Sequence, residues 1–329
     1  MYCLELAGDD DPFAAAEAGA AAGDVSVVAP GVATARSLDA DRARTLALTR
    51  RASVLVGTCD ATIDAATLAL DAATIDRTGS VAVRARDVRG TAGVDTQQAE
   101  RALGAALVDR GFDVDLDAPD HELRAVFAGD SCHLGWLAVE SDRGYGERAP
   151  TDRPFFQPGS MDPLLARALV NVAGARPGAT VLDPMCGTGG LLIEAALVGA
   201  EPVGIDAQRK MIRGTRENLA AYGGGRLLRG DATRLPLRDD AADAVVFDAP
   251  YGRQSKIERH DLADLVGGAL REARRVAPRA VVVGDRSWAE AARDAGWTVT
   301  DTFERRVHRS LVRHVAVLDT SGTPRALGD

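Results

Sequence analysis

Hydrophobic and polar positions alternate most regularly in the second half of the chain. After residue 160, short apolar runs are each followed by a longer stretch with apolar residues at helical spacing. We predict helices at 163–173, 190–198, 207–222, 262–276 and 288–295, strands at 180–182, 202–205, 226–229, 244–247 and 280–283, and a terminal hairpin of 297–303 with 311–318. Repeated strand–helix units that end in an antiparallel hairpin predict an α/β domain over residues 161–329, with a mostly parallel sheet covered by helices.

The first half alternates in two shorter groups. Residues 1–60 predict the order strand, helix, two strands, helix, strand, at 2–6, 12–22, 25–28, 31–37, 41–51 and 53–56, which is a ferredoxin-like order. Residues 61–142 predict a second small α/β module, with helices at 63–75 and 96–110, strands at 80–88 and 112–116, and a hairpin at 121–139. A stretch rich in Gly, Pro, Asp and Arg predicts a linker at 143–160. Its adjacent aromatics, Phe155 and Phe156, indicate that part of it packs against the next domain.

Composition restricts the class of protein. No run of eighteen apolar residues occurs and the start turns acidic early, so we predict neither a membrane span nor a signal peptide, and a cytoplasmic location. The four cysteines are scattered without a CxxC pair, which predicts neither a zinc site nor disulfides. Lysine occurs only at Lys210 and Lys256 and the net charge is −9, which favours a halophile's cytosol over simple codon usage. Because a net negative charge disfavours binding of polyanions, the places where arginines cluster are the ones to consider for such binding.

A glycine-rich turn follows the strand at 180–182. It reads Asp183-Pro184-Met185-Cys186-Gly187-Thr188-Gly189-Gly190 and leads into a helix, whose free N–H groups face the turn. Leu192 stands where a dinucleotide fold needs its third glycine, which weakens a dehydrogenase interpretation.

Two further acids end the next strands. Asp206 is placed to hold ribose hydroxyls, or alternatively to cap a helix. Asp231 is placed to bind an adenine amino group, or alternatively belongs to a simple turn.

A second motif, Asp248-Ala249-Pro250-Tyr251-Gly252, follows the strand at 244–247. It resembles the (Asp/Asn/Ser)-Pro-Pro-(Tyr/Phe) signature of methyltransferases that act on nucleobase amino groups. Such an amino nitrogen is a poor nucleophile, so the Asp248 carboxylate and a backbone carbonyl would accept its hydrogens and aim it at the methyl donor. Tyr251 would stack on the extruded base. Ala249 replaces the usual first proline, which leaves the backbone carbonyl in place.

These residues together resemble the archaeal tRNA guanine-N2 methyltransferases that act at position 10, relatives of the catalytic subunit of the eukaryotic enzyme. The most specific stretches are 153–161, 165–171, the turn at 183–190 and 248–252. The resemblance implies a class I Rossmann-like methyltransferase domain preceded by a ferredoxin-like domain (1–60) and a THUMP domain (61–142), with S-adenosyl-L-methionine as cosubstrate, no metal, and tRNA as partner.

The resemblance also implies residue roles. The segment Pro158 to Met161, with Ser160, lies along the cofactor as a lid. Asp183, Gly187 and Gly189 surround the methionine part, Asp206 holds the ribose and Asp231 the adenine, and the further cofactor-binding residues are Cys186, Ala232 and Asp248. The guanine is handled by Asp248, Pro250 and Tyr251. A small zinc-binding activator subunit, as in the eukaryotic enzyme, is a further hypothesis. No membrane or DNA partner is expected.

Two arginine clusters are candidates for RNA contact. The first is Arg84, Arg86 and Arg89 in the THUMP region, which would otherwise be a solvated strand face. The second lies on the terminal hairpin and predicts a phosphate track, unless it only balances neighbouring acids: Arg305, Arg306, His308, Arg309, Arg313 and His314. The histidines do not have metal-ligand spacing.

Three other functions remain open from the sequence. The same motif chemistry serves another tRNA guanine, an rRNA guanine or an adenine N6. A tRNA-binding adaptor without catalysis is a second alternative, which the intact Asp248 and glycine turn disfavour. A nicotinamide oxidoreductase is the third, and it gives residues 248–252 no purpose. The number of methyl groups added cannot be derived from the residues, and the resemblance favours the dimethylated product.

Overall fold

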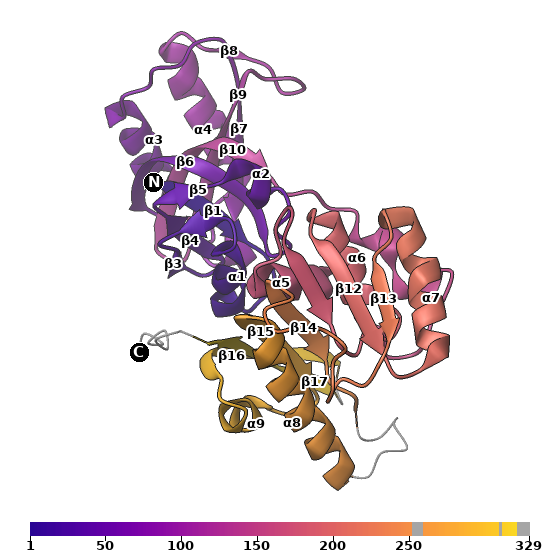
Figure 1. Ribbon diagram of the computed structural model, residues 1–329. Coiled ribbons are helices and arrows are strands. Elements are labelled where there is room, and N and C mark those ends of the chain that lie inside the picture. The colour runs from indigo at the N-terminus through magenta and orange to yellow at the C-terminus, as the bar shows by residue number, and fades with distance from the viewer. Residues whose placement is uncertain (252–258, 309–310, 321–329) are drawn as a thin grey trace. The chain divides into compact units, whose positions relative to one another are not determined.

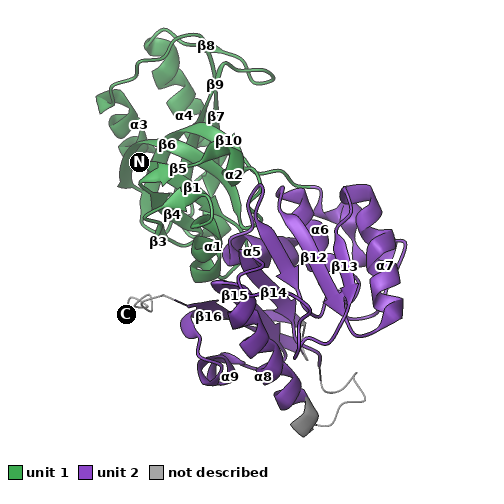
Figure 2. Ribbon diagram, viewed as in Figure 1, with its two compact units in different colours: residues 1–143 green, residues 144–329 purple. Residues whose placement is uncertain are grey.

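The computed structural model describes residues 1–251, 259–308 and 311–320. The chain divides into two compact units, Met1–Arg143 and Gly144–Asp329 (Figure 2). Within the described residues, no helix is long and apolar enough to cross a membrane.

The first unit is built on one eight-stranded sheet in the order β3-β4-β1-β6-β10-β9-β7-β8. Its strands are β1 Tyr2–Leu6, β3 Ser26–Ala29, β4 Val32–Ala35, β6 Thr49–Asp60, β7 Ser80–Asp87, β8 Asp113–Val114, β9 His121–Ala128 and β10 Ser131–Glu140. The long strand β6 pairs with β1 on one side and with β10 on the other. Residues 1–60 and 61–142 therefore share a sheet, and their division into a ferredoxin-like and a THUMP domain remains a prediction.

Short helices and a minor sheet complete this unit: α1 Asp11–Ala18, α2 Ala40–Ala43, α3 Ile63–Ala72 and α4 Thr96–Asp109, with β2 Ala22–Gly23 paired to β5 Ser37–Leu38. Helices α3 and α4 pack on the sheet through a core that includes Leu70, Leu103, Phe127 and Leu134. The hairpin predicted at 121–139 is confirmed as β9 and β10.

The helix predicted at 41–51 is wrong, because α2 ends at Ala43. The backbone N–H groups of Ala47 and Leu48 donate to the carboxylate of Glu17, each at 2.6 Å. This fully buried acid of α1 replaces the carbonyls that a longer helix would have supplied. The chain can then turn into β6, and nothing local in the sequence marks a partner so far away.

The second unit has the predicted mostly parallel sheet, in the order β13-β12-β11-β14-β15-β17-β16. Its strands are β11 Thr180–Asp183, β12 Glu201–Asp206, β13 Arg226–Arg229, β14 Ala244–Asp248, β15 Arg279–Gly284, β16 Thr298–His308 and β17 Leu311–Asp319. The first five are parallel, and β17 is antiparallel to both of its neighbours. Its helices are α5 Pro163–Ala173, α6 Gly190–Leu197, α7 Arg209–Leu219, α8 Arg259–Val276 and α9 Ala289–Asp294 (Figure 1).

This sheet brings three acids to one edge. Asp183, Asp206 and Asp248 are the last residues of β11, β12 and β14, which lie side by side in the order β12-β11-β14. Carboxyl ends of parallel strands are where open α/β sheets place their ligands. Local rules therefore put three separate stretches of sequence around one place.

The stretch predicted as a linker includes two short 3₁₀ turns, Tyr145–Arg148 and Pro150–Asp152. Phe155 packs so closely on α7 that a Cβ on Gly214 would approach its ring to 2.0 Å. Phe156 is 42% exposed. The predicted packing of this stretch is thus confirmed for Phe155.

Candidate functional site

The glycine turn between β11 and α6 has a backbone that only glycine adopts easily. Gly187 and Gly189 have φ values of 51° and 81°, in the left-handed region. A Cβ on Gly189 would lie 2.7 Å from the side chain of Thr215. The Thr215 hydroxyl in turn donates to the Gly187 carbonyl at 2.7 Å. Helix α7 therefore fixes the shape of the turn through a contact that the sequence motif does not reveal.

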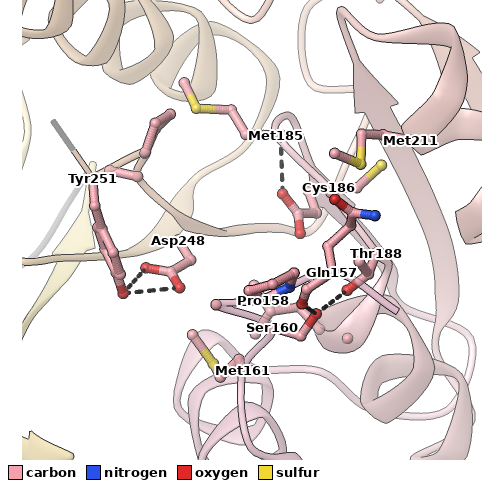
Figure 3. Close-up of a pocket in the computed structure, with 17 residues that line it drawn as sticks. Gln157, Pro158, Ser160, Met161, Met185, Cys186, Thr188, Met211, Asp248 and Tyr251 are labelled. Carbon is pink, nitrogen blue, oxygen red and sulfur yellow. Dashed lines mark hydrogen bonds between the residues drawn. The ribbon is translucent and has the colours of Figure 1, made fainter. Parts of the chain in front are cut away.

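A cavity of about 220 Å³ opens beside this turn. It brings together nine of the predicted site residues: Pro158, Ser160, Met161, Asp183, Cys186, Gly187, Asp248, Pro250 and Tyr251. Figure 3 shows Asp248 and Tyr251 on one side of it and the labelled residues of the segment 157–161 below. Met185, Thr188, Leu191 and Met211 complete much of the wall. Met185 and Thr188 belong to the predicted turn but had no role assigned, and Leu191 and Met211 lie outside the motifs.

The segment 157–161 is tied to the turn by side-chain hydrogen bonds. The Ser160 hydroxyl lies 3.0 Å from that of Thr188 and donates to the Gln157 carbonyl at 2.7 Å. Asn218, which is 2% exposed, joins the same elements further back. Its amide oxygen accepts the N–H of Phe155, and its NH₂ group donates to the carbonyls of Phe155 and Thr188, at 2.8 to 2.9 Å. One buried amide on α7 therefore positions both walls of the cavity.

Two of the strand-end acids are unusual electrostatically. Asp183 is 2% exposed, and burial raises its pKa well above the usual range, against one hydrogen bond from the Met185 N–H at 3.0 Å; Asp206 and Asp248 raise it further. Asp206 accepts N–H bonds from Gln208 at 2.8 Å and from Gly187 at 3.1 Å. Burial raises the pKa of Asp206 as well. A buried acid at the wall of a cavity is stabilised by a cationic ligand, which matches an ammonium or sulfonium group.

Four predicted cofactor residues do not line this cavity: Gly189, Asp206, Asp231 and Ala232. Gly189 and Asp206 shape the turn that does. The Asp231 carboxylate accepts the N–H and the hydroxyl of Thr233, both at 2.8 Å, as a turn residue would. Ala232 is 6% exposed, in the core of the unit. A cofactor contact from Ala232 would have to come from its backbone.

The end of β14 carries a hydrogen-bonded group of three side chains. The Tyr251 hydroxyl donates to the Asp248 carboxylate, at 2.9 and 3.1 Å from its two oxygens (Figure 3). The Arg313 Nε donates to the Tyr251 hydroxyl at 2.8 Å, and its Nη2 lies 3.4 Å from Asp248 Oδ2. Burial raises the pKa of Asp248, whereas Arg313 and then the Tyr251 hydroxyl lower it. Burial also raises the pKa of Tyr251.

Arg313 was predicted to belong to a phosphate track, and the structure corrects that assignment. Its side chain is 4% exposed and is neutralised by Asp248. Elsewhere on the hairpin, His314 lies 3.3 Å from Glu304. Arg309 and the side chain of His308 lie outside the described residues. Arg305 and Arg306 remain as candidates for phosphate contact.

The other arginine cluster is engaged within the first unit. Arg84 donates to the Leu116 carbonyl at 2.6 Å. Arg86 pairs with Glu5 at 3.3 Å and Arg89 with Asp11 at 2.5 Å. These partners explain the three arginines structurally, and their contact with RNA remains a prediction. In the part of the chain that is described, no three His, Cys, Asp or Glu side chains converge to hold a metal ion.

Comparisons with known proteins agree with this site. Residues 150–314 match the model of the RMKL-like methyltransferase domain. The chain is 39% identical over 252 residues to a tRNA (guanine(10)-N2)-dimethyltransferase of Methanothermobacter thermautotrophicus, covering 73% of each protein. It is 34% identical over 199 residues to a tRNA (guanine(6)-N2)-methyltransferase of Thermus thermophilus, covering 58% of this chain and 57% of that protein.

Solved structures show the same fold. The crystal structure of TrmN from Thermus thermophilus aligns with a TM-score of 0.51 and 25% identity, covering 97% of this chain and 99% of that one. SMU.472, a methyltransferase solved in complex with SAH, aligns with a TM-score of 0.52 and 13% identity over 98% of both chains. The second of these likenesses bears on the fold alone.

Proposed function

Because the chain belongs to the family of the archaeal tRNA (guanine(10)-N2)-dimethyltransferases, we propose that it methylates the exocyclic N2 of a guanine in tRNA, with S-adenosyl-L-methionine as methyl donor. The target is the guanine at position 10, and the final product is N2,N2-dimethylguanosine. The observation that carries the proposal is the Asp248 carboxylate, which closes one side of a cavity built on a glycine turn.

The cavity walls suit the donor. When bound, S-adenosyl-L-methionine supplies a methyl group on a positively charged sulfur. Asp183 binds the ammonium group of its methionine part, since this buried carboxylate is stabilised by a cation. The backbone of Gly187 and Gly189 approaches the same part, and Pro158, Ser160 and Met161 cover it as a lid. Asp206 holds the ribose, and Asp231 with the Ala232 backbone holds the adenine. Cys186 is a packing residue of this wall, because burial raises the pKa of its thiol and makes it unreactive.

Asp248 orients the base. Its carboxylate accepts one N2 hydrogen and the Ala249 carbonyl accepts the other, so that the nitrogen lone pair faces the methyl carbon. As the N–C bond forms and the S–C bond breaks, positive charge passes to the nitrogen, which then loses a proton. The Asp248 carboxylate stabilises that charge and accepts the proton. Pro250 fixes the loop, and the Tyr251 ring stacks on the extruded guanine.

Tyr251 and Arg313 act together on Asp248. The Tyr251 hydroxyl donates to the same carboxylate oxygens that the guanine amino group needs. Binding of the base therefore requires Tyr251 to give up that bond, while Arg313 keeps its own contact with the carboxylate. Arg313 is thus a positioning residue that lowers the pKa of Asp248 against the effect of burial.

The first unit extends the substrate contact. As the resemblance implies, a THUMP domain within residues 61–142 binds the acceptor end of tRNA. A tRNA substrate fits an enzyme of the cytoplasm, and the acidic composition with two lysines fits a halophile. Whether a small zinc-binding activator subunit is required can be decided by measuring the activity of the purified chain alone.

The test is transfer of labelled methyl from S-adenosyl-L-methionine to unmodified tRNA transcripts, in buffers from low to molar salt. Wild type is compared with Asp248→Ala, and a normal transcript with one that has adenine in place of guanine 10. Loss of incorporation in both controls supports the reaction, the residue and the position. Incorporation that survives the guanine replacement refutes position 10 and favours another amino group. No transfer by the wild type favours a required partner or a tRNA-binding adaptor.

A further inference from the structure

A groove on the second unit concentrates positive charge in an otherwise acidic chain. It has a volume of about 750 Å³ and is lined by residues of helix α7 and strand β13. Strand β13 is the outermost strand at one end of the sheet, and α7 lies beside it (Figure 1). Five basic residues line the groove, and we call them the α7–β13 strip: Arg209, Lys210, Arg213, Arg216 and Arg229. All five are exposed, and no acidic residue is among the lining residues.

The arrangement follows from the two elements. Positions 209, 213 and 216 are spaced so that they share one face of α7. The first and last lie seven positions apart, or about 10 Å along the helix axis. The groove floor is apolar, with Ile212 of the helix against Leu227 of the strand, and Arg229 shares the strand face of Leu227. The result is a row of guanidinium groups above a hydrophobic floor.

Among the residues that the structure describes, little neutralises this row. Arg213 lies 3.9 Å from Glu217, and both side chains are more than half exposed, so this pair is worth little. Arg229 donates through Nε to the Ala207 carbonyl at 3.0 Å, a bond that leaves its charge unpaired. Lys210 lies 5.6 Å from the centre of the Phe155 ring. In a chain with a net charge of −9, a groove whose charged lining residues are all positive needs an explanation.

The strip adjoins the methyl-transfer cavity. Met211 in the first turn of α7 lines that cavity, between strip residues 210 and 213. We infer that the α7–β13 strip binds the phosphates of the tRNA strand that delivers the target guanine to the cavity. This inference rests on the proposed function and adds the surface that holds the strand. It adds a phosphate-binding surface at the end of the sheet opposite the hairpin β16–β17, where Arg305 and Arg306 remain candidates.

The ordinary alternative is protection of an exposed strand edge, for which charged side chains are common. Both explanations place arginines here, but only phosphate binding makes the affinity for tRNA depend on them. At 1 M salt the screening length is only about 3 Å, so any contribution that persists there must come from direct contacts. A salt titration therefore measures the quantity on which the two explanations differ.

The experiment compares Arg213→Glu/Arg216→Glu with the control Arg279→Glu/Arg293→Glu. The control makes the same change in net charge at exposed arginines of β15 and α9, outside the groove. Dissociation constants for an unmodified tRNA transcript are measured from 0.1 to 1 M KCl, together with kcat and both KM values. The thermal midpoint of each variant is recorded as well. A milder pair, Arg213→Gln/Arg216→Gln, serves if the Glu pair lowers that midpoint.

We expect the strip variant to bind tRNA at least about tenfold more weakly at low salt. The slope of log affinity against log salt should become shallower by about one to two, because one or two phosphate contacts are lost. The KM for S-adenosyl-L-methionine and kcat at saturating tRNA should be unchanged. Equal binding by strip and control variants would overturn the inference, as would a loss confined to the KM for S-adenosyl-L-methionine. Binding is read without turnover, so the inference can fail while wild-type methyl transfer stands.

Discussion

Replacing Arg313 by methionine should reduce the rate of methyl transfer most strongly at low pH. Methionine keeps much of the length and apolar stem of arginine but removes the charge 3.4 Å from Asp248 Oδ2 and the hydrogen bond to Tyr251. Burial then raises the pKa of Asp248 without its main opposing cause. Only the ionised carboxylate can accept the amino hydrogens of guanine without offering a proton of its own. The acid limb of kcat should therefore move to higher pH.

The size of the shift follows from the distance. Two unit charges 3.4 Å apart attract by about 5 kcal/mol at an effective dielectric constant of about 20. This attraction is an upper limit on how much Arg313 favours the ionised form of Asp248. The Asp248 side chain is 22% exposed, and water entering beside methionine will recover part of the loss. We therefore expect a clear upward shift of the acid limb, smaller than this limit.

The assay is single-turnover methyl transfer at saturating tRNA between pH 5 and 9, for wild type, Arg313→Met and Arg313→Lys. Lysine keeps the charge, so its acid limb should lie closer to that of wild type. Thermal unfolding shows whether each variant is folded, since breaking a buried charge pair can cost about 3–5 kcal/mol. A folded Arg313→Met enzyme with the wild-type pH profile would refute the role assigned to Arg313.

Three further changes test the cavity. Gly189→Ala should raise the KM for S-adenosyl-L-methionine about tenfold or more, because the added Cβ meets Thr215. The control is Gly178→Ala, at a glycine with a similar φ of 77° but open space around it. Activity and unfolding assays should show that the control changes stability alone. Asn218→Ala removes three hydrogen bonds, so calorimetry should show a free energy of unfolding that is lower by about 2–4 kcal/mol. The KM for S-adenosyl-L-methionine should rise, and an unchanged KM would contradict the positioning role of Asn218. Tyr251→Phe should keep the KM for tRNA within about threefold and Tyr251→Ala should raise it about tenfold or more, since stacking on a base contributes about 1–3 kcal/mol; equal KM values would exclude stacking.

The parts of the fold that local sequence determines were predictable. Alternating strands and helices gave the parallel sheet, and an acid at the end of a strand is recognisable where the strand stops. Asp183 and Asp248 were therefore found at one edge of the sheet. The prediction of a helix at 41–51 was wrong because the N–H groups of Ala47 and Leu48 donate to the Glu17 carboxylate and not to helix carbonyls. Asn218 escaped notice for a similar reason, since nothing in α7 indicates that Phe155 and Thr188 are its partners.

Arg313 shows why counting charges along a hairpin misleads. In β17, Arg313 shares a strand face with Val315 and Val317, but the alternate positions, Ala316 and Leu318, are equally apolar and buried. Alternation therefore could not tell whether the arginine points to solvent or inward. The partner that decides the orientation of Arg313 is Asp248, at the end of another strand. A buried carboxylate without a cation is strongly destabilising, whereas a phosphate at the surface is solvated by water. Basic residues grouped in sequence thus divide by what lies opposite them: Arg313 serves the reacting site, and the exposed arginines of α7 are left to meet RNA.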